Sequence, residues 1–136
     1  MQKVFVDTDV CFDLLSGRKP FYKSAEILFS LADTGKIKIY VSALSFANIG
    51  YVLRSQYSAS HSRQIIAKFK TLVQVLPVDN KTLDLAIASN FKDFEDAIQY
   101  ACALEYNLNL LVTRNVKDYK NATIQILTPE TFLSMY

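Results

Sequence analysis

The chain has 136 residues, of which 51% are apolar, so it has enough apolar material to form one domain with its own core. Two domains are not expected, and we predict a single domain over residues 1–136. The 15 Lys and Arg residues nearly balance the 13 Asp and Glu residues, and the net charge is only +2. This balance excludes a protein that attracts nucleic acid through its overall field, so a nucleic-acid substrate would need a local basic patch.

The sequence also argues against membrane insertion and secretion. No apolar run approaches the roughly 20 residues that span a bilayer, and no charged segment followed by a long apolar one marks a secretion signal. Cys11 and Cys102 both lie in apolar, helix-like surroundings, which is typical of buried and reduced thiols. We therefore expect a cytoplasmic protein that does not insert into a membrane.

In chain order, the first predicted element is a strand, Lys3–Val6, whose continuous apolar run is typical of a strand covered on both faces of a parallel sheet. Further strands are predicted at Ile37–Val41, Val73–Val78, Leu108–Val112 and Ile124–Leu127. Helices are predicted at Val10–Leu15, Phe21–Asp33, Leu44–Tyr57, Arg63–Leu72, Lys81–Ala88, Asp93–Asn107 and Pro129–Tyr136, with a serine-rich turn before the fourth. Strands that alternate with helices predict a three-layer α/β/α sandwich around a mostly parallel, five-stranded sheet.

Polar residues follow four of the five predicted strands. Ligands of open α/β sheets bind outside the carboxyl ends of the strands, so these residues are candidates for one shared site. Asp79 is the exception, because it is better placed to cap the following helix. Asp13, on an amphipathic helix, is expected to face solvent. The polar residues at the strand ends are Asp7 and Asp9, Ser42, Asp79, and Thr113 with Asn115.

Acidic residues also open the sixth predicted helix, where Asp93 and Asp96 lie on one face together with Gln99 or Tyr100. Crowded carboxylates repel one another, and a hard cation with oxygen ligands, Mg²⁺ or Mn²⁺, relieves that repulsion. Such an ion makes phosphodiester hydrolysis the leading chemistry. Alternatively, the two aspartates only cap the helix and interact with its dipole. Glu95 would reach the ion only if this helix faces the edge of the sheet.

Three segments resemble the recurring motifs of PIN domains, a family that includes the VapC-like toxin ribonucleases. They are Val6–Asp9, Asp93–Gln99 and Val112–Tyr119, and they occur in the family's order and spacing. The resemblance covers essentially the whole chain. It implies a ribonuclease that cleaves single-stranded RNA with one or two Mg²⁺ or Mn²⁺ ions. For a toxin it also implies a homodimer and an antitoxin partner.

The resemblance also assigns roles to individual residues. Asp7 and Asp96 correspond to metal ligands, and Asn115 and Asp118 lie in the segment that supplies the last acid or its substitute. The full set of expected site residues is Asp7, Asp96 and Asp118 for catalysis, Asp7, Asp96 and Asn115 for the metal, Asp9, Ser42, Asn48, Asp93 and Thr113 in support, and Arg114 and Lys117 for the substrate. Arg18, Lys19 and Lys23 are further candidates for phosphate contacts.

One position departs from the family's usual pattern. Asn48 stands where a glutamate is common. The oxygen of an amide can bind a metal, but an amide carries no charge and cannot act as a base. A module that has lost catalysis and only binds RNA or a protein partner is therefore a serious alternative. Tyr51, Tyr57 and Phe69 add apolar surface to the third and fourth helices, which fits either an interface or the core.

Two other enzyme-like interpretations start from the same Asp7-Thr8-Asp9 motif. A haloacid-dehalogenase-type phosphatase would use Asp7 as its nucleophile, but no later Lys is followed by a strand that ends in paired acids, and the chain is short for that fold. A response-regulator receiver needs Lys-Pro after its fifth strand, where this chain has Thr128-Pro129. A motif without its structural context is weak evidence, so we rank both below the PIN domain.

Overall fold

A computed structural model describes residues 1–136 and contains one five-stranded sheet. The strand order is β3-β2-β1-β4-β5, and every neighbouring pair is parallel. The strands are β1 (Gln2–Val6), β2 (Ile37–Ser42), β3 (Gln74–Leu76), β4 (Leu110–Val112) and β5 (Gln125–Leu127). The predicted parallel sheet is confirmed.

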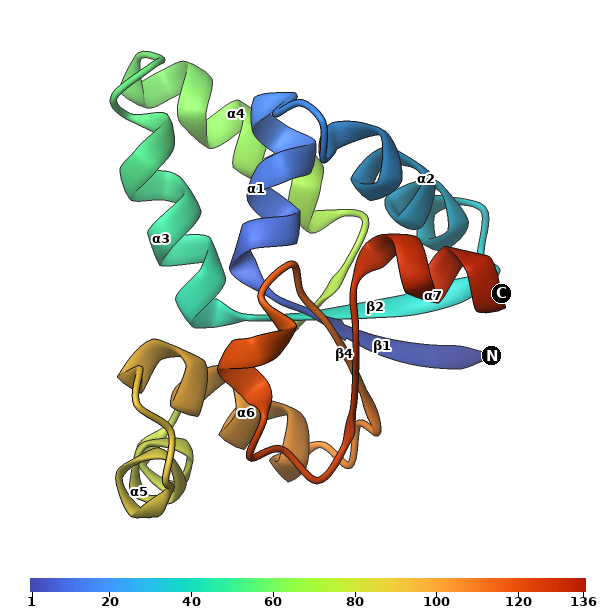
Figure 1. Ribbon diagram of the computed structural model, residues 1–136. Helices are drawn as coiled ribbons and strands as arrows, with labels where there is room; N and C mark the ends of the chain where they lie inside the picture. Colours follow the sequence, from blue (N-terminus) through green and yellow to red (C-terminus); the bar gives the residue numbers. More distant parts are fainter.

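Helices cover both faces of the sheet (Figure 1), which confirms the three-layer α/β/α arrangement. Helices α1 to α4 and α7 lie on one face, and α5, α6 and the 3-10 helix η1 lie on the other. Their bounds are α1 (Thr8–Ser16), α2 (Tyr22–Asp33), α3 (Ala43–Leu53), α4 (Ala59–Lys70), α5 (Asn80–Ala88), α6 (Phe94–Glu105), η1 (Val116–Tyr119) and α7 (Pro129–Met135). None of these helices combines the length and the apolar character that crossing a bilayer requires.

The central strand β1 organises the core. Val4, Phe5 and Val6 are completely buried, as expected for a strand with neighbours and helices on all sides. Because successive side chains of a strand point to opposite faces, Val4 and Val6 join the larger apolar cluster under α1 to α4, and Phe5 joins a second cluster on the α6 side. Cys11 and Cys102 are both buried and free, as predicted.

Three polar residues that follow a strand or a loop begin the next helix by capping it. Asp7 is the N-cap of α1, Ser42 that of α3 and Asp93 that of α6. Asp79 forms a capping box with Thr82 at the start of α5, so its predicted capping role is confirmed. The chain thus turns from β1 into α1 and from β2 into α3 at the same edge of the sheet.

The α3–α4 connection differs from the prediction. The third helix ends at Leu53 rather than Tyr57, and the fourth begins at Ala59 rather than Arg63. Ser58 is the reason for the earlier start, because its Oγ accepts a hydrogen bond from the backbone N–H of His61 at 3.1 Å and so caps the helix. His61 therefore lies in the first turn of α4.

Candidate active site

A pocket of about 430 Å³ opens at the carboxyl edge of the sheet. It is bordered by α1, α3, the first turns of α6 and the segment that follows β4. Four acids line it, and they alternate with cationic and amide side chains. The polar lining residues are Asp7, Thr8, Asp9, Arg18, Asn48, Glu95, Asp96, Gln99, Arg114 and Asn115.

Asp7 is the most firmly held side chain of the pocket and is 7% exposed. Its Oδ1 accepts hydrogen bonds from the backbone N–H of Thr8 at 2.8 Å and from Gln99 Nε2 at 3.1 Å. Its Oδ2 accepts hydrogen bonds from Thr113 Oγ1 at 2.9 Å and Tyr119 OH at 3.0 Å. These donors come from four separate parts of the chain and fix the carboxylate in one orientation. They also compensate its buried negative charge.

Gln99 connects Asp7 to the start of α3 and is itself 2% exposed. Its Nε2 also lies 3.0 Å from Thr8 Oγ1 and 2.8 Å from Ser45 Oγ, and its Oε1 accepts a hydrogen bond from Ser42 Oγ. Ser42 is thus completely buried behind Gln99 and does not line the pocket. The sequence indicated Gln99 only through its place on the same helix face as Asp96.

Tyr119 joins the two principal acids. Its hydroxyl lies 3.0 Å from Asp7 Oδ2 and 3.4 Å from Asp96 Oδ1. Burial and the charge of Asp7 raise the pKa of Asp96 to about 7, and Asp93 and Asp118 add to this effect. Burial and the charges of Asp7 and Asp96 raise the pKa of Tyr119 far above its ordinary value, so the hydroxyl stays protonated and acts as a donor. The protein therefore compensates the ionised form of Asp96 poorly.

Asp93 caps α6, as the capping interpretation expects. Its Oδ1 accepts a hydrogen bond from the backbone N–H of Asp96 at 3.0 Å. The same interpretation is incomplete for Asp96, because the carboxylate of Asp96 approaches Tyr119 and lines the pocket.

Asp9 holds the segment after β4 against α1. Its Oδ2 accepts hydrogen bonds from the backbone N–H of Arg114 at 3.1 Å, from Asn115 Nδ2 at 3.2 Å and from Thr113 Oγ1 at 3.3 Å. Its Oδ1 is buried and has no hydrogen-bond partner. Burial and the charge of Asp7 raise the pKa of Asp9 to about 6. Oδ2 of Asp9 therefore positions the loop, and Oδ1 accepts no hydrogen bond within the protein.

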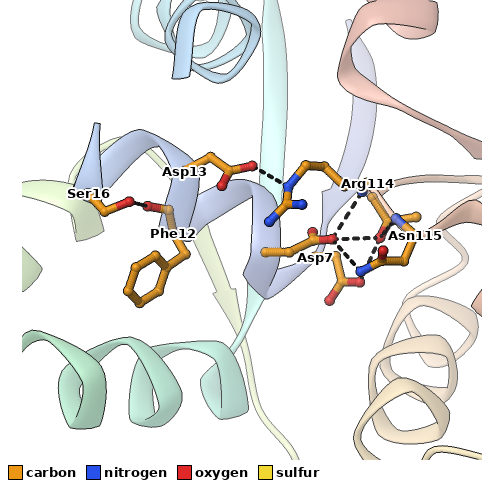
Figure 2. A network of polar contacts seen from close by, with 8 residues as sticks. Asp7, Phe12, Asp13, Ser16, Arg114 and Asn115 are labelled. Atoms are coloured by element: carbon orange, nitrogen blue, oxygen red, sulfur yellow. Dashed lines mark hydrogen bonds and ion pairs between the residues drawn. The ribbon is translucent and has the colours of Figure 1, made fainter. Parts of the chain in front are cut away.

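Arg114 anchors this loop to the first helix. Its Nε lies 2.6 Å from Asp13 Oδ2, and its guanidinium carbon lies 4.1 Å from the centre of the Phe21 ring. Figure 2 shows Arg114 reaching from the loop towards Asp13. Asp13 is only 1% exposed, so the expectation that it faces solvent is wrong. Burial raises its pKa and the Arg114 guanidinium opposes that rise, so the ion pair stabilises a carboxylate that would otherwise be unpaired in the core.

The departure at Asn48 has a counterpart across the pocket. Asn48 Nδ2 lies 3.5 Å from Glu95 Oε2, and both residues line the pocket. Glu95 is exposed, and α6 does face the edge of the sheet, which is the condition under which Glu95 was expected to reach a metal. A carboxylate is therefore present beside the position where the usual glutamate is missing.

Two expected residues lie apart from this pocket. Asp118 and Lys117, both exposed on η1, line a second pocket of about 190 Å³ together with Asp93. Asp96 lines both pockets and separates them. The structure therefore brings Asp7, Asp9, Asn48, Asp96 and Asn115 together and places Asp118 on the far side of Asp96.

The donor set fits a hard divalent ion held by few protein ligands. The pocket offers carboxylate and amide oxygens and no thiol or imidazole. No three Asp, Glu, His or Cys side chains meet closely enough to form a ready-made cage. Mg²⁺ keeps several waters and is commonly bound through one or two carboxylates, so a cage is not required. The free Oδ1 of Asp9 and the raised pKa of Asp96 mark where positive charge is needed.

Comparison with known proteins identifies the family. A sequence profile of the PIN domain matches residues 3–117, which is most of the chain. The chain therefore belongs to the PIN domain family. The family assignment decides against the phosphatase and receiver interpretations of the opening motif.

Individual relatives agree with this assignment. The chain is 26% identical to Ribonuclease VapC1 of Aquifex aeolicus (strain VF5) over 96% of this chain and 93% of the relative. Among solved structures it is similar to VapBC-1 from nontypeable Haemophilus influenzae, with a TM-score of 0.72 and 18% identity over 95% of this chain and 99% of that one. A toxin-antitoxin complex from Klebsiella pneumoniae gives a TM-score of 0.69 and 20% identity over 93% and 97% of the two chains. These structural likenesses support the fold.

Proposed function

We propose that this protein is a metal-dependent endoribonuclease that cleaves single-stranded RNA. The observation that carries the proposal is the pairing of a rigidly held buried carboxylate, Asp7, with a poorly compensated one, Asp96, in an open pocket. The family membership and the ribonuclease name of the Aquifex relative support the same chemistry.

Asp7 and Asp96 would hold Mg²⁺ or Mn²⁺, and the amide oxygen of Asn115 is the further candidate ligand. When bound, the ion supplies charge stabilisation at the phosphate and an activated water. Asn115 donates through Nδ2 to Asp9, which leaves its Oδ1 without a hydrogen bond inside the protein. Asp118 would act from the second pocket, through its negative charge next to Asp96.

Glu95 would supply the charge that Asn48 lacks. The two side chains meet at 3.5 Å, so a carboxylate on α6 occupies the space that a glutamate on α3 would share. Unlike Asp7, Glu95 is exposed and accepts no second hydrogen bond, so it remains free to face the ion. This arrangement favours an active enzyme over a module that only binds.

Gln99 and Tyr119 are positioning residues for Asp7, and Asp9 and Thr113 position the loop that carries Asn115. Each acts through another side chain.

The partners follow from the same relatives. The solved neighbours include VapBC assemblies and a toxin-antitoxin complex. We extend this to an antitoxin partner and a homodimer for this chain. Arg18 and Arg114 line the pocket and would neutralise phosphates of the RNA strand, and Lys117 would do so from the second pocket, on η1.

The test is cleavage of single-stranded RNA by protein that has been stripped of metal with EDTA and then given Mn²⁺. We expect cleavage by the wild type, none by Asp7→Asn or Asp96→Asn, and none in EDTA. Circular dichroism would establish that both variants fold. Equal RNA loss with wild type and variants would refute the nuclease and favour the binding module.

A further inference from the structure

A third polar pocket lies between α3 and α4, on a surface that the proposed chemistry does not use. It measures about 240 Å³ and is lined by Gly50, Arg54, Ala59, Ser62, Arg63 and Ile66. We propose that this pocket binds a backbone phosphate of the single-stranded RNA, at a subsite separate from the acidic centre. The proposal rests on the proposed function for the identity of its ligand, but its evidence is independent of the acids.

Ser62 gives the first argument. It is 2% exposed, and its Oγ is buried without any hydrogen-bond partner. Folded proteins rarely leave a buried hydroxyl unpaired, because the lost hydration is not recovered. A phosphate oxygen in the pocket would satisfy this donor. Ser62 also lies near the start of the 12-residue helix α4, whose positive end favours an anion.

Charge gives the second argument. Arg54 and Arg63 line the pocket from opposite helices, and both are exposed to an incoming ligand. No acid opposes them nearby in the chain, because residues 34–78 contain no Asp or Glu at all. The same stretch carries the cations Lys36, Lys38, Arg54, Arg63, Lys68 and Lys70. Of these, Arg54 and Arg63 line the pocket, and they form the local basic patch that a nearly neutral protein needs in order to bind a phosphate chain.

Aromatic side chains on α3, on α4 and in the turn between them favour RNA over an acidic peptide. Tyr51 is 82% exposed although it lies on a packed helix. Tyr57 stacks on His61 with ring centres 4.9 Å apart and an interplanar angle of 12°. Exposed rings next to arginines are the usual platform on which unpaired bases stack. Phe69, by contrast, is part of the core.

Helix α3 links the two sites. Asn48 and Val52 line the acidic pocket, and Gly50 and Arg54 line the basic one. Arg54 is six positions after Asn48, a rise of about 9 Å along the helix, but each pair faces the opposite side of α3, because residues two positions apart differ by about 200° around the axis. In Figure 1, α3 runs from the carboxyl edge of the sheet to the α3–α4 turn. One RNA strand that occupies both sites would therefore have to pass around α3.

The experiment compares two double variants that remove the same charge. Arg54→Gln/Arg63→Gln empties the pocket of cations, and Lys68→Gln/Lys70→Gln is the control at the other, exposed end of α4. Binding of a fluorescent oligouridylate is measured by anisotropy in EDTA, where no cleavage occurs, over a range of salt concentrations. We expect binding roughly tenfold weaker for the arginine pair and a salt slope lower by about 0.7 per lost phosphate contact. Equal weakening by both pairs, or by neither, would overturn the proposal.

Ser62→Ala sharpens the test. If Ser62 binds phosphate, the variant should bind RNA about threefold more weakly and melt at the same or a higher temperature, because an unpaired buried hydroxyl has been removed. Unchanged RNA affinity would refute the subsite. An oligoglutamate peptide is the competing ligand: if its binding, and not that of RNA, depends on the two arginines, the pocket binds an acidic protein segment instead. Because EDTA prevents cleavage, RNA binding that depends on Arg54 and Arg63 would stand even if the wild type proved unable to cut RNA.

Discussion

Replacing Asp96 with Asn should make the metal-free protein more stable at neutral pH. The pKa of Asp96 is about 7 in the folded protein against an ordinary value of 3.8. A pKa difference of about 3 units means that ionised Asp96 lowers the free energy of unfolding by at most about 4 kcal/mol. Because the side chain is only partly buried, solvent screening reduces this to about 2 kcal/mol. Losing a favourable acid in the first turn of α6 subtracts about 0.3 to 1 kcal/mol, which leaves a gain of about 1 to 2 kcal/mol.

The gain must depend on pH. Below about pH 4 Asp96 is protonated in both the folded and the unfolded state, and its contribution to the free energy of unfolding is fully present. Because its pKa is raised in the folded state, this contribution is lost as the pH rises through about 7. Asparagine does not ionise, so Asp96→Asn avoids the loss. The advantage of the variant should therefore be absent near pH 4 and complete near pH 8. Mn²⁺ should reverse the order, because an ion that binds the folded wild type stabilises only the protein that keeps its ligand.

Thermal unfolding in EDTA between pH 4 and 8 measures this directly. At pH 8 the variant should melt roughly 3 to 8 °C above the wild type, as expected for about 1 to 2 kcal/mol in a domain of this size. Asp84→Asn, an exposed carboxylate on α5, is the matched control and should change little. A melting temperature for Asp96→Asn below that of the wild type at pH 8, or a gain of equal size at pH 4, would refute the account of Asp96.

Three further substitutions test other parts of the site. Glu95→Gln should lower the cleavage rate, and the Mn²⁺ affinity measured by thermal stabilisation, each by about 10-fold to 100-fold, in line with the loss of a metal-site carboxylate. An unchanged rate together with an unchanged affinity would remove Glu95 from the site. Tyr119→Phe removes a donor to the buried Asp7 and should cost about 1 to 3 kcal/mol in urea unfolding, and a neutral effect would contradict that hydrogen bond. Arg114→Ala leaves Asp13 buried and unpaired, so it should cost about 3 to 5 kcal/mol. A cost under about 1 kcal/mol in the same assay would show that the ion pair is not formed.

The part of the site that sequence could predict is the part that parallel topology dictates. Parallel strands present their carboxyl ends at one edge, so polar residues just after β1 and β4 had to meet. Asp7, Asp9 and Thr113 do so, with the Thr113 hydroxyl 2.9 Å from Asp7 Oδ2 and 3.3 Å from Asp9 Oδ2. Ser42 also lies at the carboxyl end of its strand, but its side chain points inward and donates to Gln99 instead of lining the pocket. A strand end fixes where a side chain begins and leaves open which way it points.

The residues that sequence missed all owe their role to tertiary packing. Tyr119 and Asp7 are 112 positions apart, and only the packing of η1 under the sheet brings the hydroxyl to the carboxylate. Asp13 follows a helical pattern that usually faces solvent, and it is buried because Arg114 reaches it from a loop about 100 residues away. The periodicity of apolar residues within one helix or strand does not predict such contacts between distant residues.

The site divides into a rigid half and an unsatisfied half, and this division bears on whether Asn48 abolishes catalysis. Asp7 is surrounded by donors, so its orientation does not depend on an ion. Asp96 and Glu95 have few donors and line the same open pocket, and one oxygen of Asp9 is buried there without a hydrogen bond. The protein thus keeps more negative charge at this edge than its own hydrogen bonds neutralise. Losing one carboxylate on α3 leaves that excess in place, because Glu95 stands next to the amide that replaced it.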